Sequence, residues 1–124
     1  MSLLQHLRMY HGDWMPKREE LNDLFASRPS LPFTVYPTGE NVTGRPVITD
    51  TIIAETYITL PDTTEPVLLT EFYLQKYRYR IQNVEEFAVF FDSEPHKIYP
   101  AELIFIYEIE TYSMYLPNRF TIVV

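Results

Sequence analysis

The chain has 124 residues, of which 46% are hydrophobic and 15% aromatic, and its formal net charge at pH 7 is −7. This length is typical of one domain with one core, so we expect a single domain over residues 1–124. The chain has no cysteine, which excludes disulfide bonds, thiolate zinc sites and cysteine nucleophiles. An acidic surface repels phosphate groups and therefore does not favour nucleic acid as a partner.

Residues 1–30 are predicted to be helical. Ser2 is a suitable N-cap for a first short helix, and Pro16 suits the first turn of a second one that stops before Pro29. Each helix has an apolar stripe at helical spacing, made of Leu3, Leu4 and Leu7 in the first and of Leu21, Leu24 and Phe25 in the second. We expect both stripes to pack against the protein's own sheet.

Residues 31–124 are predicted to be mainly β-structure, because Thr, Ile, Tyr, Val and Phe are frequent there and prolines separate the runs. Residues 31–36 form a short strand, which Pro32 and Pro37 place at the edge of a sheet. Residues 38–46 contain two glycines and are predicted to be a loop, the segment best suited to be mobile and functional.

Residues 47–60 and 67–81 are predicted to form one long antiparallel hairpin around a turn at 61–66. In such a strand one face would carry three tyrosines and the other three bases, namely Tyr73, Tyr77 and Tyr79 against Lys76, Arg78 and Arg80. Nucleic-acid recognition needs stacking and cationic groups on the same face. The alternation therefore indicates a half-buried strand and not a nucleic-acid site.

Residues 83–92 fit two interpretations. Helical spacing relates Val84, Phe87, Ala88 and Phe91, while strand spacing relates Phe87, Val89 and Phe91. Asn83 and Glu86 resemble a capping box, so we favour a short helix, followed by a loop over 92–100. Residues 101–115 are predicted to be the strongest strand, and 120–124 the last one.

The predicted strand over 101–115 has an acidic face made of Glu102, Glu108 and Glu110. If this strand neighbours the hairpin, its carboxylates are placed for cross-strand pairs with Arg78 and Arg80. The alternative is that one of the two charged rows faces a partner chain.

These elements predict an α+β fold, with one or two N-terminal helices packed on a mainly antiparallel sheet of five or six strands. The alternative fold is a small β-barrel or sandwich with a helical cap.

The sequence has no recognisable catalytic, cofactor or metal site. Glu85 and Glu86 sit at a predicted helix start, where acids are favoured by the helix dipole. His6 and His11 are five residues apart and would diverge on a helix, which does not suit a metal site. We therefore expect no enzymatic activity, no cofactor and no metal. The N-terminus lacks a signal-peptide pattern and no apolar run could span a membrane, so we expect a cytoplasmic protein, or a virion protein if it is a viral subunit.

The sequence favours a non-enzymatic protein–protein interaction module, a small structural or assembly subunit of viral or phage type that self-associates or binds a protein partner. Tyrosine suits interfaces because it buries apolar area and keeps a polar tip. The expected contact residues are Tyr57, Tyr73, Tyr77, Tyr79, Arg78 and Arg80. Two alternatives stay open: an acidic inhibitor that imitates nucleic acid, and a small-molecule binder or small enzyme with an aromatic pocket.

Overall fold

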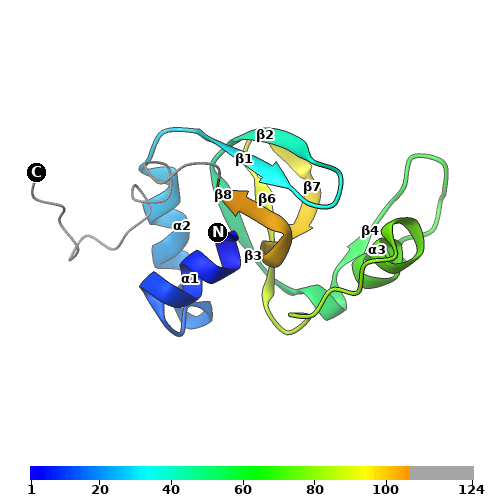
Figure 1. The fold of residues 1–124 in the computed structure, drawn as a ribbon, viewed down its shortest axis with the longest axis horizontal. Helices are drawn as coiled ribbons and strands as arrows, with labels where there is room; N and C mark the ends of the chain where they lie inside the picture. Colours follow the sequence, from blue (N-terminus) through cyan, green and yellow to red (C-terminus); the bar gives the residue numbers. More distant parts are fainter. Residues whose placement is uncertain (107–124) are drawn as a thin grey trace, which may run out of the picture.

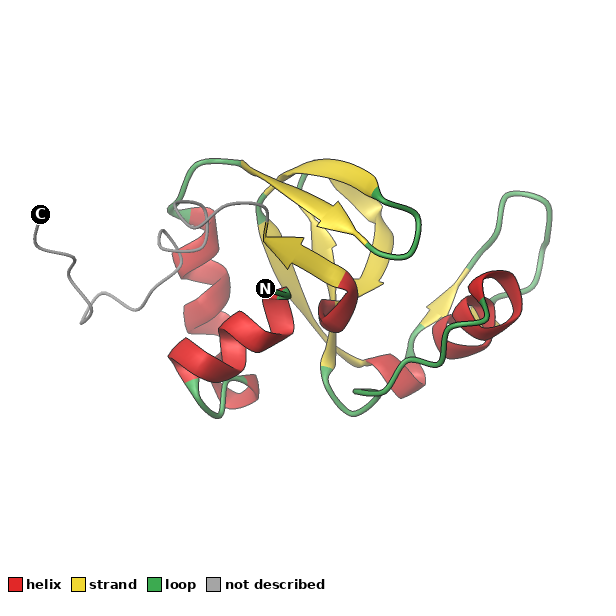
Figure 2. Ribbon diagram, viewed as in Figure 1, coloured by secondary structure: helices red, strands yellow, loops and turns green. Residues whose placement is uncertain are grey.

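The computed structural model describes residues 1–106, which form an α+β fold with two parts (Figures 1 and 2). The body consists of the two N-terminal helices and two three-stranded antiparallel sheets. The arm, which we define as residues 53–82, contains a two-stranded sheet and the third α-helix. Within residues 1–106 no helix is long and apolar enough to cross a membrane.

Helix α1 (Leu3–His11) begins at the N-cap predicted from the sequence. The Ser2 hydroxyl accepts a hydrogen bond from the Gln5 N–H at 3.1 Å, and the Gln5 side chain accepts one from the Ser2 N–H at 2.8 Å. This reciprocal capping box satisfies two N–H groups that the first helical turn leaves free. The helix ends at Gly12, whose φ of 63° is a conformation that favours glycine.

Helix α2 (Arg18–Ala26) follows the short 3-10 helix η1 (Met15–Lys17), which holds Pro16 in its first turn. The predicted apolar stripes of both helices are buried at Leu3, Leu4, Leu7, Leu21 and Phe25, and Leu24 packs against them. The prediction of a helical region over residues 1–30 is thus confirmed.

The first sheet has the strand order β2-β1-β8, with β1 (Leu31–Val35) in the middle between β2 (Glu40–Gly44) and β8 (Ile104–Ile106). The prediction that residues 31–36 form an edge strand is therefore wrong. Pro32 is tolerated because β8 pairs only with residues 33–35 of β1, so the missing N–H of Pro32 falls beyond that pairing. The predicted loop over 38–46 is also wrong, since β2 and the start of β3 occupy it.

The second sheet has the order β3-β6-β7, formed by β3 (Pro46–Ile52), β6 (Phe87–Phe91) and β7 (Glu94–Pro100). The helix favoured for residues 83–92 and the loop predicted for 92–100 are both wrong. β6 is the central strand of its sheet, and its apolar run is largely buried. Such a run fits a strand as well as a helix, because all of its residues are apolar and match either spacing.

The two three-stranded sheets enclose one shared core. Phe33 of β1 and Phe91 of β6 are both fully buried, with ring centroids 5.0 Å apart. Arg45 joins β2 to β3, and the 3-10 helix η3 (Ala101–Leu103) joins β7 to β8. The predicted α+β class is confirmed, but the predicted single sheet of five or six strands is replaced by smaller antiparallel sheets.

The arm interrupts the second sheet between β3 and β6 (Figure 1). It contains η2 (Ile53–Glu55), β4 (Tyr57–Ile58), β5 (Val67–Leu68) and α3 (Leu69–Tyr77). The predicted long hairpin is wrong, because β4 and β5 pair over only two residues each and the chain then turns into a helix. Leu69 and Tyr73 are four residues apart and both buried, which is the spacing of one helix face.

The remaining predictions concern the C-terminal part of the chain. The strand expected over 101–115 begins as η3 and β8. Residues 107–115, the predicted last strand over 120–124, and the carboxylates of Glu108 and Glu110 lie outside the described residues.

Candidate interaction surface

The arm has a small core of its own at its junction with the body. Ile53, Leu69, Tyr73 and Ile81 of the arm are buried together with Ala88 and Leu103 of the body. This cluster is separate from the main core, which lies between the sheets and the N-terminal helices. The arm is therefore held to the body by a limited apolar contact.

Glu102 of η3 connects the body to the segment that follows α3. One of its carboxylate oxygens accepts a hydrogen bond from the Tyr79 hydroxyl at 2.8 Å. The other accepts bonds from the backbone N–H groups of Asn83, at 2.8 Å, and Gln82, at 3.1 Å. The Tyr79 ring also meets that of Tyr36 on the body, with centroids 5.9 Å apart. The predicted pairing of Glu102 with Arg78 and Arg80 is wrong, because this carboxylate binds the hydroxyl and backbone of the same segment.

The buried tyrosines of this junction are poor candidates for acid–base chemistry. Burial, followed by the hydrogen bond to Glu102, raises the pKa of Tyr79 to about 12. Burial also raises the pKa of Tyr73 well above its usual value, and neighbouring tyrosines add to the effect. Both hydroxyls are therefore neutral at physiological pH, and that of Tyr79 acts as a hydrogen-bond donor.

The predicted contact tyrosines lie at different depths. Tyr57 is 58% exposed at the surface of the arm, whereas Tyr73 is only 5% exposed and belongs to the arm core. Tyr77 and Tyr79 are half-buried. Because Tyr73 faces inward, the apolar side chains that the arm presents to solvent are Tyr57 and Leu74, of which Leu74 is 45% exposed.

A groove of about 480 Å³ runs between α3 and the segment after it. Most of its surface is apolar, although its lining consists of four apolar residues and four polar or charged ones, namely Ala54, Leu74, Ile81 and Val84 with Thr70, Glu71, Arg80 and Gln82. The sequence analysis missed Leu74 and this groove, because both depend on residues 69–77 being a helix.

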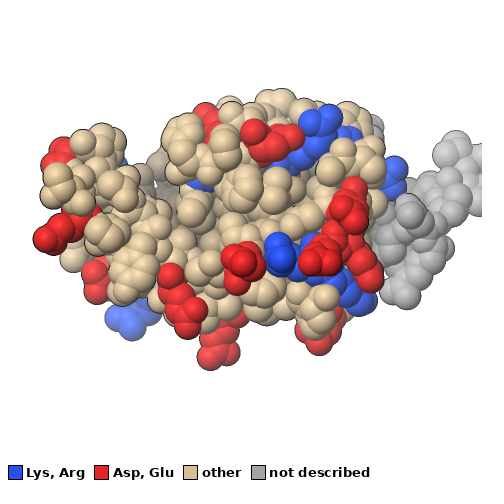
Figure 3. Space-filling model, turned by 180° about the vertical axis from the view of Figure 1, so that it is seen from behind, with Lys and Arg blue, Asp and Glu red and all other residues tan. Residues whose placement is uncertain are grey.

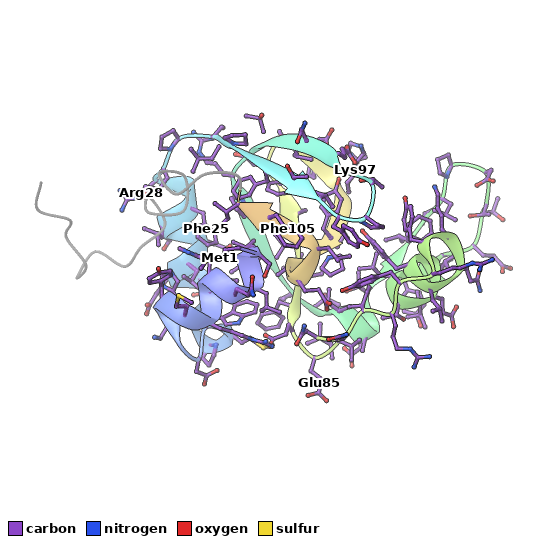
Figure 4. The ribbon with its side chains drawn as sticks, viewed as in Figure 1. Met1, Phe25, Arg28, Glu85, Lys97 and Phe105 are labelled. Atoms are coloured by element: carbon purple, nitrogen blue, oxygen red, sulfur yellow. The ribbon has the colours of Figure 1, made fainter. Side chains whose placement is uncertain are left out.

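Three exposed bases, Lys76, Arg78 and Arg80, lie at and just after the end of α3, and we name them the basic segment. Within residues 1–106 none of them forms an ion pair. The body differs: Arg8 pairs with Glu86 at 2.6 Å, and Lys97, labelled in Figure 4, pairs with Glu40 at 3.1 Å. The basic segment is thus a group of three bases without ion pairs within residues 1–106, on an arm that also carries the acids Glu55, Asp62, Glu65 and Glu71.

Aromatic contacts and an unusual backbone conformation position the basic segment. The Lys76 ammonium lies 5.4 Å from the centroid of Phe72 and 5.6 Å from that of Tyr77, distances of cation–π contacts. Arg78 ends the helix in the left-handed conformation, with φ of 52°. Glycine is the usual residue there, because a side chain costs about 1 kcal/mol in that conformation.

The body carries exposed apolar side chains of its own at Met1, Met9, Tyr36 and Phe105. Met1 and Phe105 lie near one another (Figure 4), and the Ile106 N–H donates to the Met1 carbonyl at 3.0 Å. This surface borders Ile106, where the described residues end.

The histidines predicted to diverge are brought together instead. His6 and His11 are both buried, and their ring centroids are 5.8 Å apart. Residues 1–106 nevertheless contain no group of three or more side chains that could hold a metal ion.

Comparisons with known proteins add no family to this description. No protein-family model matches the chain, and no curated protein matches it either.

Proposed function

We propose that this protein is a non-enzymatic protein–protein interaction module and that the arm is its contact surface. The observation that carries the proposal is the exposure of Tyr57 and Leu74 on a projecting segment, beside an apolar groove. Apolar and aromatic side chains beside unpaired arginines are the composition that protein interfaces favour. With this surface we propose the role of a structural or assembly subunit, and a viral or phage origin remains a prediction.

The carboxylates of β2, β6 and their neighbourhood do not suit the contact face of an acidic inhibitor that imitates nucleic acid. Such an inhibitor presents free carboxylates to a basic partner. In this chain Glu40, Glu86 and Asp92 are ion-paired with bases of the body. The backbone N–H of Arg45, helped by its guanidinium, holds the pKa of Asp92 below its usual value, which reflects a carboxylate already engaged within the fold.

Site-specific photo-crosslinking in the organism that encodes the protein tests the proposal. A benzophenone amino acid replaces Tyr57 or Leu74 in the full chain, and Met9 is the matched control, because it is an exposed apolar residue of the body. We expect discrete protein adducts from positions 57 and 74 and a much lower yield from position 9. Adducts from position 9 alone, or from no position, would contradict the arm as the contact surface.

A further inference from the structure

We propose that this chain assembles head to tail with copies of itself, the arm of one copy binding the exposed acidic face of α2 on the next. The inference rests on the proposed function and names the partner of that same surface. The acidic face consists of Glu19, Glu20 and Asp23.

The two surfaces lie at opposite ends of the molecule. Figure 1 shows α1 and α2 at one end of the ribbon and α3 at the other, with the sheets between them. The arm of a copy is therefore remote from its own α2, and contact between these surfaces requires a second molecule.

The acids of this α2 face, like the bases of the basic segment, form no ion pair within residues 1–106. Glu19, Glu20 and Asp23 are all exposed. The neighbouring Arg18 is directed elsewhere, because its guanidinium donates to the Ile48 carbonyl at 3.4 Å. Figure 3 shows acidic side chains on this half of the molecule with basic ones beside them, and further acidic side chains toward the arm.

Helix geometry concentrates the negative charge of this face. Glu19 and Asp23 are four residues apart, and Glu20 and Asp23 are three apart, so their side chains are neighbours on the helix surface. Like charges at these spacings repel one another and weaken a helix. A cation supplied by a second molecule would relieve that repulsion, and the basic segment offers three.

Apolar groups accompany the charges on both sides. A hollow of about 400 Å³ beside the acidic face is lined by Glu20, Asp23, Leu24, Ser27 and Arg28. On the arm, Arg80 of the basic segment and the exposed Leu74 line the same groove. Each surface thus combines a charged group with an apolar one, which gives both attraction and buried area.

A contact between two different surfaces leaves one free arm and one free acidic face on every dimer. Such heterologous contacts add further copies until they close a ring or extend a filament. This distinguishes the proposal from a symmetric dimer, which uses one surface twice and stops at two copies.

Sedimentation velocity of the full chain tests the charge requirement. We expect association at about 100 µM protein in about 50 mM NaCl, and its loss in about 500 mM NaCl because salt screens exposed charges. The double variant R78Q/R80Q should weaken association by about tenfold or more, whereas R78K/R80K should retain it. The control S30E/T43E lowers the net charge of −7 by the same two units at exposed sites of the body and should associate like the wild type.

A mixing experiment tests the head-to-tail geometry. The triple variant E19Q/E20Q/D23N and the variant R78Q/R80Q should each be monomeric alone, because each lacks one of the two surfaces. Mixed in equal amounts they retain one intact surface of each kind, so we expect a 1:1 dimer that does not grow further. A monomeric wild type at low salt, an unaffected triple variant, or the absence of a dimer in the mixture would each overturn the proposal.

The crosslinking experiment separates this inference from the proposed function. Adducts from position 74 to a peptide of α2 of another copy support both. Adducts to a different protein, with a monomeric wild type in sedimentation, leave the proposed function standing and overturn self-assembly.

Discussion

The body has a large apolar core, whereas the arm has only a small one, which it shares with the body. Phe25, Phe33 and Phe91 of the body are fully buried in a core to which both large sheets and both N-terminal helices contribute. The arm has a smaller cluster, and Tyr57 and Leu74 stand outside it. The difference indicates that the body core contributes most of the stability of the fold, while the arm is the part proposed to make contacts.

This comparison has a consequence for local stability. Regions with few buried apolar contacts open at a lower free energy than the whole protein. The arm is held by its small core and by the hydrogen bonds of Glu102, so we expect it to open while the body stays folded. If the arm opened only at the free energy of unfolding of the whole protein, the body and the arm would not differ in local stability.

The largest expected effect comes from the body core. Phe91→Ala removes a fully buried ring that contacts Phe33 and Tyr99, and we expect a loss of about 3–5 kcal/mol in the free energy of unfolding. Chemical denaturation measures this loss, and the exposed Tyr57→Ala is the control, with a change within about 0.5 kcal/mol. Equal losses for both variants would contradict the distinction between body and arm.

A change in the arm core should act locally. Leu69→Ala removes a side chain that is 1% exposed, and we expect the closed arm to lose about 2–5 kcal/mol relative to its open state. Native-state hydrogen exchange should show faster exchange over residues 53–82 and little change in β1 and β6. Faster exchange throughout the body would show that the two parts unfold as one unit.

The junction should show a smaller effect. Glu102→Gln keeps the size of the side chain but removes the charge that accepts bonds from Tyr79 and Asn83, and we expect the arm to be destabilised by about 1–3 kcal/mol. Glu85→Gln is the matched control, because Glu85 is an exposed neighbour that points away from the ribbon (Figure 4). A double-mutant cycle with Tyr79→Phe measures the share of the loss that depends on the Tyr79 hydroxyl.

Local sequence signals predicted the N-terminal helices and failed for the arm. The capping box at Ser2 and the stripes of α1 and α2 depend only on neighbours in sequence. Helix α3 lacks such a signal, since its N-cap residue, Leu68, makes no side-chain cap bond. Its aromatic residues also favour strands, and only their packing against the body decides for a helix.

The candidate site was predictable in composition but not in geometry. The bases and tyrosines of residues 76–80 were identified from the sequence, but on a strand that does not exist. Glu102 lies 23 residues from Tyr79, and no local pattern predicts which of many polar groups such a distant carboxylate will bind. The two surfaces proposed to associate became visible only when the fold placed them at opposite ends.

The smallest expected change in stability comes from Arg78, where a substitution that stabilises the arm should weaken self-association. Arg78→Gly places the residue best suited to φ of 52° at the end of α3, so we expect the arm to gain up to about 1 kcal/mol. The same change removes a charge of the basic segment and should weaken self-association in sedimentation. Arg78→Asn is the matched comparison, since asparagine also tolerates this conformation and is equally uncharged. If Arg78 makes no contact with a second copy, both variants should be more stable and associate like the wild type. If Arg78 contributes to self-association, both variants should associate more weakly than the wild type.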